Sequence, residues 1–231
     1  MQRREFIKLC GASAAAGFTG NASADAAPVM YARVKLVDDA GRPLRATAVP
    51  AHRNLIFHYP YTSTPCFLLN LGRPLTTSRT LRTADRQDYR WTGGVGAQRS
   101  IVAYSAICAH QLAYPTREIS FISYRAEASA RNRHARVIHC CAEHSQYDPA
   151  EGGRVLAGPA PQPLAAILLE HDPRSDELHA VGTLGGELFR EFFAKYEMRL
   201  SMERGGAARR PVEDTATVTD MRFYCRQQVK C

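Results

Sequence analysis

The sequence predicts an all-β fold that ends in one C-terminal helix. Short apolar runs bounded by Pro, Gly and Asp clusters recur from residue 31 to residue 181, which is typical of strands. Only one stretch carries apolar side chains at spacings of three and four residues. The chain has 231 residues, of which 45% are hydrophobic and 23% charged. This composition supports a buried core and excludes a disordered chain.

The expected strands follow one another with short turns between them. They lie at residues 31–37, 54–59, 66–71, 100–107, 119–124 and 136–140, with a hairpin at 164–170 and 177–181. Residues 72–98 are polar and are expected to form a long loop. Residues 187–202 predict a helix whose apolar face docks onto the domain. That face is formed by Phe189, Phe192, Phe193, Tyr196 and Leu200.

The N-terminus has the features of an export signal. Arg3 and Arg4 precede an aromatic and an aliphatic residue, a weakly apolar stretch follows, and a small-x-small site ends at Ala24. This resembles a bacterial twin-arginine signal and implies a periplasmic protein. We expect residues 1–24 to be cleaved, whereas an uncleaved signal would tether the protein to the membrane. No run of 18 uncharged apolar residues occurs, which argues against a multi-span membrane protein.

The charge of the chain is basic but dispersed. The formal net charge is +8, and removal of the four charged residues before residue 25 lowers it to +6. No Lys/Arg cluster interleaves with aromatic residues, so the sequence gives no support for nucleic-acid binding. The remaining positive charge favours an acidic redox partner. Residues 125–135 form a basic insertion that is either a solvated loop or part of a docking surface.

Two short motifs, each following an expected strand, pair a cysteine with a histidine. The first is Cys108-x-His110 and the second is Cys141-x2-His144. Two thiolates and two imidazoles suit either one tetrahedral zinc ion or a [2Fe–2S] cluster with mixed ligands.

The residues after the second motif resemble Rieske iron–sulfur proteins. Ser145-x-Tyr147-Asp148 is followed by the loop Gly158-Pro159-Ala160-Pro161, as in the Rieske subunits of cytochrome bc and b6f complexes. The resemblance covers about residues 95–184. It implies stacked antiparallel sheets with two cluster-binding loops that hold a Rieske [2Fe–2S] cluster. The expected organisation is then a β-rich part at 25–94, a Rieske domain at 95–184 and a C-terminal helix and tail at 185–231.

The resemblance also assigns roles to residues. Cys108 and Cys141 would bind the inner iron, and His110 and His144 the outer iron. Neutral imidazoles in place of thiolates raise the reduction potential. The hydroxyls of Ser145 and Tyr147 would donate to sulfur atoms and raise it further. The prolines of the following loop would form a rigid cover over the cluster; they are Pro159 and Pro161.

The chain departs from the family pattern at two places. A family disulfide that ties the two loops together is absent, because its positions correspond to Ala113 and Glu143. The family also has a Gly between the ligand His and the Ser. Aligning back from Ser145 puts Cys140 and Glu143 at the ligand positions, but carboxylate suits this role poorly. We therefore prefer Cys141 and His144 with a one-residue deletion, and Cys140 stays as the alternative.

The implied function is one-electron transfer. The donor would be a quinol, within a quinol-oxidising membrane complex, or a dehydrogenase, and the acceptor a cytochrome-type protein. The chain would be an electron-transfer subunit of an oxidoreductase complex rather than a catalyst by itself. One alternative is the small Rieske subunit of a periplasmic molybdenum oxidoreductase of the arsenite oxidase type. Another is a zinc-binding structural or interaction module.

The remaining cysteines and histidines have simpler interpretations. Cys66 lies in an apolar run and is expected to be a buried small hydrophobe. Cys225 and Cys231 are candidates for a disulfide in an oxidising compartment. The other histidines lack partners at ligand spacing and are expected to be structural or solvated; they are His52, His58, His134, His139, His171 and His179.

Overall fold

The computed structural model describes residues 26–129 and 133–231. The predicted export signal, residues 1–24, lies outside the described residues. The strands are β1 (Val29–Val37), β2 (Leu55–His58), β3 (Pro65–Asn70), β4 (Arg79–Arg82), β5 (Asp88–Trp91), β6 (Ile101–Ser105), β7 (Ile119–Ser120), β8 (Ile122–Arg125), β9 (Val137–Cys140), β10 (Ser145–Asp148), β11 (Arg154–Ala157), β12 (Ala166–Asp172), β13 (Glu177–Leu184), β14 (Thr215–Thr217), β15 (Thr219–Asp220) and β16 (Gln227–Gln228). The helices are α1 (Phe189–Arg204) and α2 (Met221–Tyr224), with short 3-10 turns at Ala46–Ala48, Pro149–Glu151 and Gly205–Ala207.

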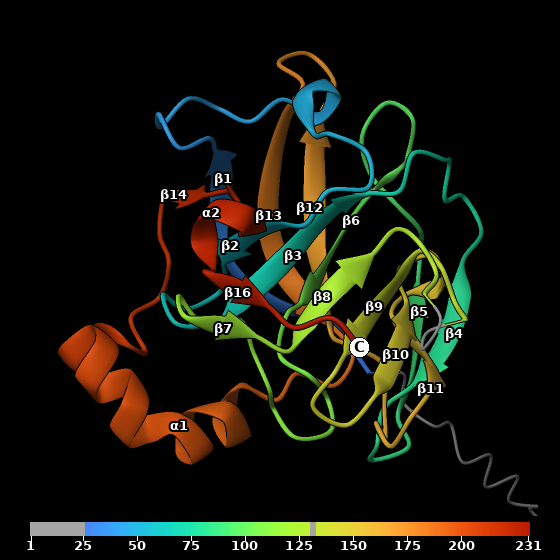
Figure 1. Cartoon of the computed structure of the whole chain (residues 1–231). Coiled ribbons are helices and arrows are strands. Elements are labelled where there is room, and N and C mark those ends of the chain that lie inside the picture. Colours follow the sequence, from blue (N-terminus) through green and yellow to red (C-terminus); the bar gives the residue numbers. More distant parts are fainter. Residues whose placement is uncertain (1–25, 130–132) are drawn as a thin grey trace, which may run out of the picture.

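The strands form one large and three small sheets, and most pairs are antiparallel. The eight-stranded sheet has the order β14-β1-β13-β12-β6-β3-β2-β15, and the four-stranded sheet has the order β11-β10-β9-β8. The four-stranded sheet lies beside the eight-stranded sheet, and the C-terminus lies next to the four-stranded sheet (Figure 1). The predicted all-β class with a C-terminal helix is confirmed. The large sheet joins N-terminal and C-terminal parts of the described chain, because β1 pairs with both β13 and β14.

The expected strands are present, and the sequence missed several others. The segment 72–98 contains the hairpin β4–β5 instead of a long loop, so that prediction is wrong. Tyr89 and Trp91 of β5 are buried in the core while Arg90 between them is exposed. This alternation of buried and exposed side chains is too short to be recognised among the polar residues around it. The tail also contains β14, β15 and β16, which are too short to show a period.

The aromatic face of α1 docks onto the domain, as predicted. Phe189, Phe192, Phe193 and Leu200 are buried and form a cluster with Tyr114. Figure 1 shows the helix on the outside of the sheets, at the lower left. Among the described residues, no helix is both long enough and apolar enough to span a membrane.

Candidate metal centre

The first motif lies in a tight loop that leaves β6 and returns to β7. The backbone N–H of Cys108 donates to the carbonyl of Ala113 at 2.9 Å, and the N–H of Leu112 donates to the carbonyl of Cys108 at 3.0 Å. Cys108 is buried, while His110 at the turn is only partly buried. The loop therefore presents a buried thiol and a more superficial imidazole two residues apart.

The second motif follows β9 and leads into β10. Cys140 is the last residue of β9 and is fully buried, whereas Cys141 just beyond the strand is partly exposed. Neighbouring residues at a strand end point in opposite directions, so only one of the two can face the core. The structure turns Cys140 inward, toward the first loop.

Cys140 and Cys108 form a buried thiol pair. A hydrogen bond between their side chains lowers the pKa of the Cys108 thiol and raises that of Cys140. The hydroxyl of Tyr147 lies 3.2 Å from Cys108 Sγ and accepts a hydrogen bond from the Ala109 N–H at 3.1 Å. Tyr147 is fully buried on β10, so its hydroxyl connects the strand after the second loop to the first loop.

Cys141, which was predicted to supply a thiolate, is not a free thiol in this structure. Its Sγ is bonded to Sγ of Cys231 at 2.09 Å, and the two Cα atoms are 5.7 Å apart. Cys225 is a free buried thiol, so it does not pair with Cys231. Cys66 is also free and fully buried, as expected for a small hydrophobe.

The second loop contains a residue in the left-handed backbone conformation. His144 has a positive φ of 59°, a conformation that glycine adopts most easily. It directly precedes Ser145, where the Rieske pattern has its glycine. Cys140, and not Cys141, lies beside Cys108. The alignment that puts Cys140 at the ligand cysteine puts Glu143, and not His144, at the ligand histidine. Glu143 and His144 are both exposed at this loop.

Two polar atoms at the centre lack partners among the described residues. They are Nδ1 of His110 and Oγ of Ser145, and both atoms are buried. A buried polar group without a partner costs free energy, so such atoms commonly mark a ligand or a water site. Two thiols, an unpartnered imidazole nitrogen and an unpartnered hydroxyl fit a thiolate–imidazole metal centre.

The loop that begins at Gly158 lies directly on the second motif. Gly158 has a φ of 87°, and a Cβ there would lie 2.6 Å from both the carbonyl oxygen of His144 and the Cα of Ser145. Only glycine allows this approach. Pro159 and Pro161 follow it at the surface, next to the predicted ligand loop.

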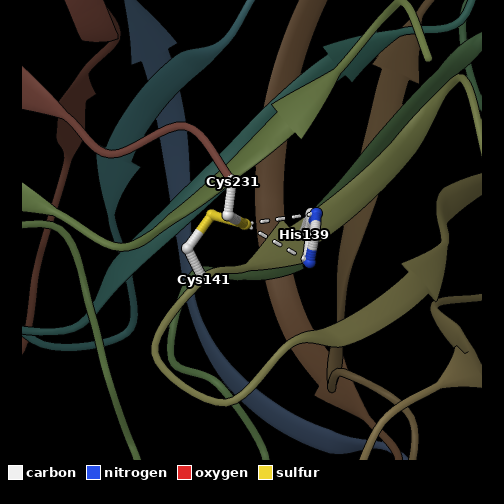
Figure 2. Close-up of side chains that lie close together, drawn as sticks. All are labelled: His139, Cys141 and Cys231. Carbon is white, nitrogen blue, oxygen red and sulfur yellow. Dashed lines mark hydrogen bonds between the residues drawn. A yellow bond between two sulfur atoms is a disulfide. The ribbon is translucent and has the colours of Figure 1, made fainter. Parts of the chain in front are cut away.

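Beside the disulfide lies the imidazole of His139. Figure 2 shows the ring next to the sulfur of Cys231, with its two nitrogens 3.7 and 3.6 Å away. The three potential ligand atoms lie within 4.8 Å of one another. Both cysteine sulfurs are bonded to each other in the disulfide, so the three residues provide no thiolate ligand for a metal. Burial lowers the pKa of His139 to about 4, which keeps the ring neutral.

The sequence interpretation missed the importance of Cys231. Nothing in its local sequence connects it to a residue 90 positions earlier. Cys140 did carry a signal, because the segment Ser145-x-Tyr147-Asp148 aligns it with the ligand cysteine.

The chain has similarity to a solved structure. No protein-family model matches the chain. The chain is similar to the soluble domain of Rieske protein II (SoxF) from Sulfolobus acidocaldarius, at 26% sequence identity and a TM-score of 0.46. The alignment covers 66% of this chain and 78% of that one.

Proposed function

We propose that the protein is a one-electron carrier that holds a Rieske-type [2Fe–2S] cluster between its two Cys/His loops. The observation that carries this proposal is the buried pair of Cys108 and Cys140, approached by the hydroxyl of Tyr147. Bound there, such a cluster supplies a reversible one-electron couple at a higher potential than an all-cysteine cluster.

Four residues would bind the two irons. Cys108 and Cys140 would hold the inner iron as thiolates, and His110 and His144 would hold the outer iron. The unpartnered Nδ1 of His110 supports its part in this set. His144 is preferred over Glu143 because imidazole is the softer ligand. Its exposure would leave one edge of the centre open to a partner.

The surrounding residues support a centre that is closed to water on one side. The hydroxyl of Tyr147 can donate a hydrogen bond to Cys108 Sγ. The hydroxyl of Ser145, which has no partner among the described residues, can also donate a hydrogen bond to sulfur. Such donors stabilise the reduced, more negative cluster and so raise its potential. The loop with Pro159 and Pro161 would limit the access of water to the outer iron.

The proposed partners are redox proteins that dock at the exposed side of the second loop. The donor would be a quinol-oxidising complex or a dehydrogenase subunit, including a molybdenum enzyme of the arsenite oxidase type, and the acceptor a cytochrome-type protein. A structural disulfide is typical of exported proteins. The Cys141–Cys231 bond therefore supports the proposal that the protein works in the periplasm after twin-arginine export.

The purified protein tests the proposal directly. We expect a brown protein that contains equal amounts of iron and acid-labile sulfide and gives a Rieske-type EPR signal after reduction with dithionite. A colourless protein that contains zinc instead of iron would contradict the proposal and would favour a zinc module.

A further inference from the structure

The C-terminal tail reaches both cluster-binding loops. The backbone N–H groups of Arg226 and Gln227 donate to the carbonyls of Arg117 and Glu118, at 2.9 and 3.0 Å. These acceptors lie between the first loop and β7. The short strand β16 then runs parallel to β7. The tail is thus attached to the segment that leaves the first loop.

The same tail continues to the second loop, where the attachment becomes covalent. The N–H of Val229 donates to the carbonyl of Ser120 at 2.8 Å, and the guanidinium of Arg125 on β8 donates to the carbonyl of Val229. Two residues later, Cys231 is bonded to Cys141. Cys141 directly follows Cys140, so the disulfide lies one residue from a proposed iron ligand.

We propose that residues 226–231 form a strap that joins the two cluster-binding loops, with Cys141 and Cys231 as positioning residues for the cluster. The inference rests on the proposed function. The two positions that would form an inter-loop disulfide in the Rieske pattern are Ala113 and Glu143. The strap connects the same two loops by a different route, through hydrogen bonds on one side and a disulfide on the other.

The strap acts on the cluster through the backbone of the second loop. The N–H of Cys141 donates to the carbonyl of Phe121 at 2.6 Å, and the disulfide holds its side chain against the tail. These two constraints act at the start of the loop from Ala142 to His144, whose side chains are exposed. At its other end the loop is held by the pairing of Ser145 with Cys140. Substitution of residues that orient metal ligands commonly lowers metal affinity on the order of tenfold or more.

Three single variants separate the strap from a general effect of cysteine loss. Cys231→Ser and Cys141→Ser each remove the disulfide. The matched control is Cys225→Ser, because Cys225 is a free buried thiol in the same tail whose Sγ donates to the carbonyl of Gln227 at 3.1 Å.

The measurement is the rate at which visible absorbance of the cluster is lost in a chelator. We expect both disulfide variants to assemble the cluster and to lose it on the order of tenfold faster than the wild type, while Cys225→Ser matches the wild type. The EPR line shape of freshly purified Cys231→Ser should also broaden. Lower global stability by itself leaves the line shape of the intact cluster unchanged. Wild-type loss rates in both disulfide variants would overturn the proposal.

Two further readouts do not depend on a cluster. Peptide mapping without reductant should recover a fragment in which Cys141 is linked to Cys231, and its absence would overturn the strap. Amide hydrogen exchange at residues 142–145 should accelerate in Cys231→Ser, and unchanged exchange would also overturn it. If the wild type holds no cluster, the proposed function fails while these readouts still decide whether the strap exists.

Discussion

The two loops that are proposed to bind the cluster are stabilised by different kinds of contact. The first loop is packed against α1, where Tyr114 meets the rings of Phe192 and Tyr196 at centroid distances of 4.9 Å. The second loop is held by the disulfide at Cys141. Both contacts come from residues 185–231. The C-terminal region is therefore part of the proposed metal centre rather than an appendage to it.

Because the contacts differ, the two loops are expected to lose their structure under different conditions. Packing contacts are distributed over many atoms and weaken gradually, whereas a disulfide is either present or absent. A disulfide that closes 90 residues removes entropy from the unfolded chain and commonly contributes about 2–5 kcal/mol. We expect the first loop to respond to changes in the core and the second to respond to reductants.

The largest expected effect is at the contact between α1 and the first loop. Phe192 is fully buried, and Phe192→Ala would leave a cavity that lowers the free energy of unfolding by about 3–5 kcal/mol. Chemical denaturation measures this loss, and exchange at residues 108–114 should accelerate while residues 142–145 stay protected. Met198→Ala, at a 78% exposed position of the same helix, is the control. Equal deprotection of both loops would show that they are not held independently.

A smaller effect is expected where the two loops are joined by a side chain. Tyr147→Phe keeps the ring but removes the hydroxyl that meets Cys108 Sγ and the Ala109 N–H. Loss of a buried hydrogen bond to a thiolate should cost about 1.5–3 kcal/mol in stability. The midpoint potential should fall, because one donor toward sulfur is gone. Protein-film voltammetry measures the potential, and an unchanged value would exclude the proposed role of this hydroxyl.

The smallest expected effect is a pH dependence of the stability, which comes from a histidine between α1 and α2. His58 Nε2 lies 3.4 Å from Arg204 of α1 and 3.3 Å from the hydroxyl of Tyr224. Burial, together with Arg204 and Arg117, lowers the pKa of His58 from 6.5 to about 3. The unfolded imidazole takes up a proton below about pH 6.5 while the folded one stays neutral, so stability falls as the pH drops from 6.5 toward 3.

The variant His58→Gln isolates this contribution. The wild type should lose about 2 kcal/mol more than the variant between pH 7 and pH 5. Urea denaturation at both pH values measures the difference. Parallel losses in the two proteins would show that His58 titrates normally and that burial does not exclude its proton.

The sequence predicted the parts of the molecule whose signals are local. The strands on either side of the two loops and the aromatic face of α1 repeat at short intervals that periodicity detects. The first motif was also correctly placed at a loop after a buried strand. The hairpin β4–β5 was missed, because its alternation spans only four residues in each strand.

The inward orientation of Cys140 and the Cys141–Cys231 disulfide depend on tertiary structure. Cys140 and Cys141 are adjacent, and only the direction of β9 decides which of them faces Cys108. His144 takes the left-handed conformation that favours glycine, a choice made by the backbone of the loop and not by the residue type. Cys231 meets Cys141 only because β16 pairs with β7, and two residues per strand give no readable sequence pattern.

The assignment of the inner thiolate is tested most directly by EPR spectroscopy of two neighbouring variants. Cys140→Ser should abolish the Rieske-type signal of the reduced protein, because it removes the thiol that faces Cys108. Cys141→Ser should retain the signal, since this sulfur belongs to the disulfide. A signal that persists in Cys140→Ser and disappears in Cys141→Ser would contradict the account.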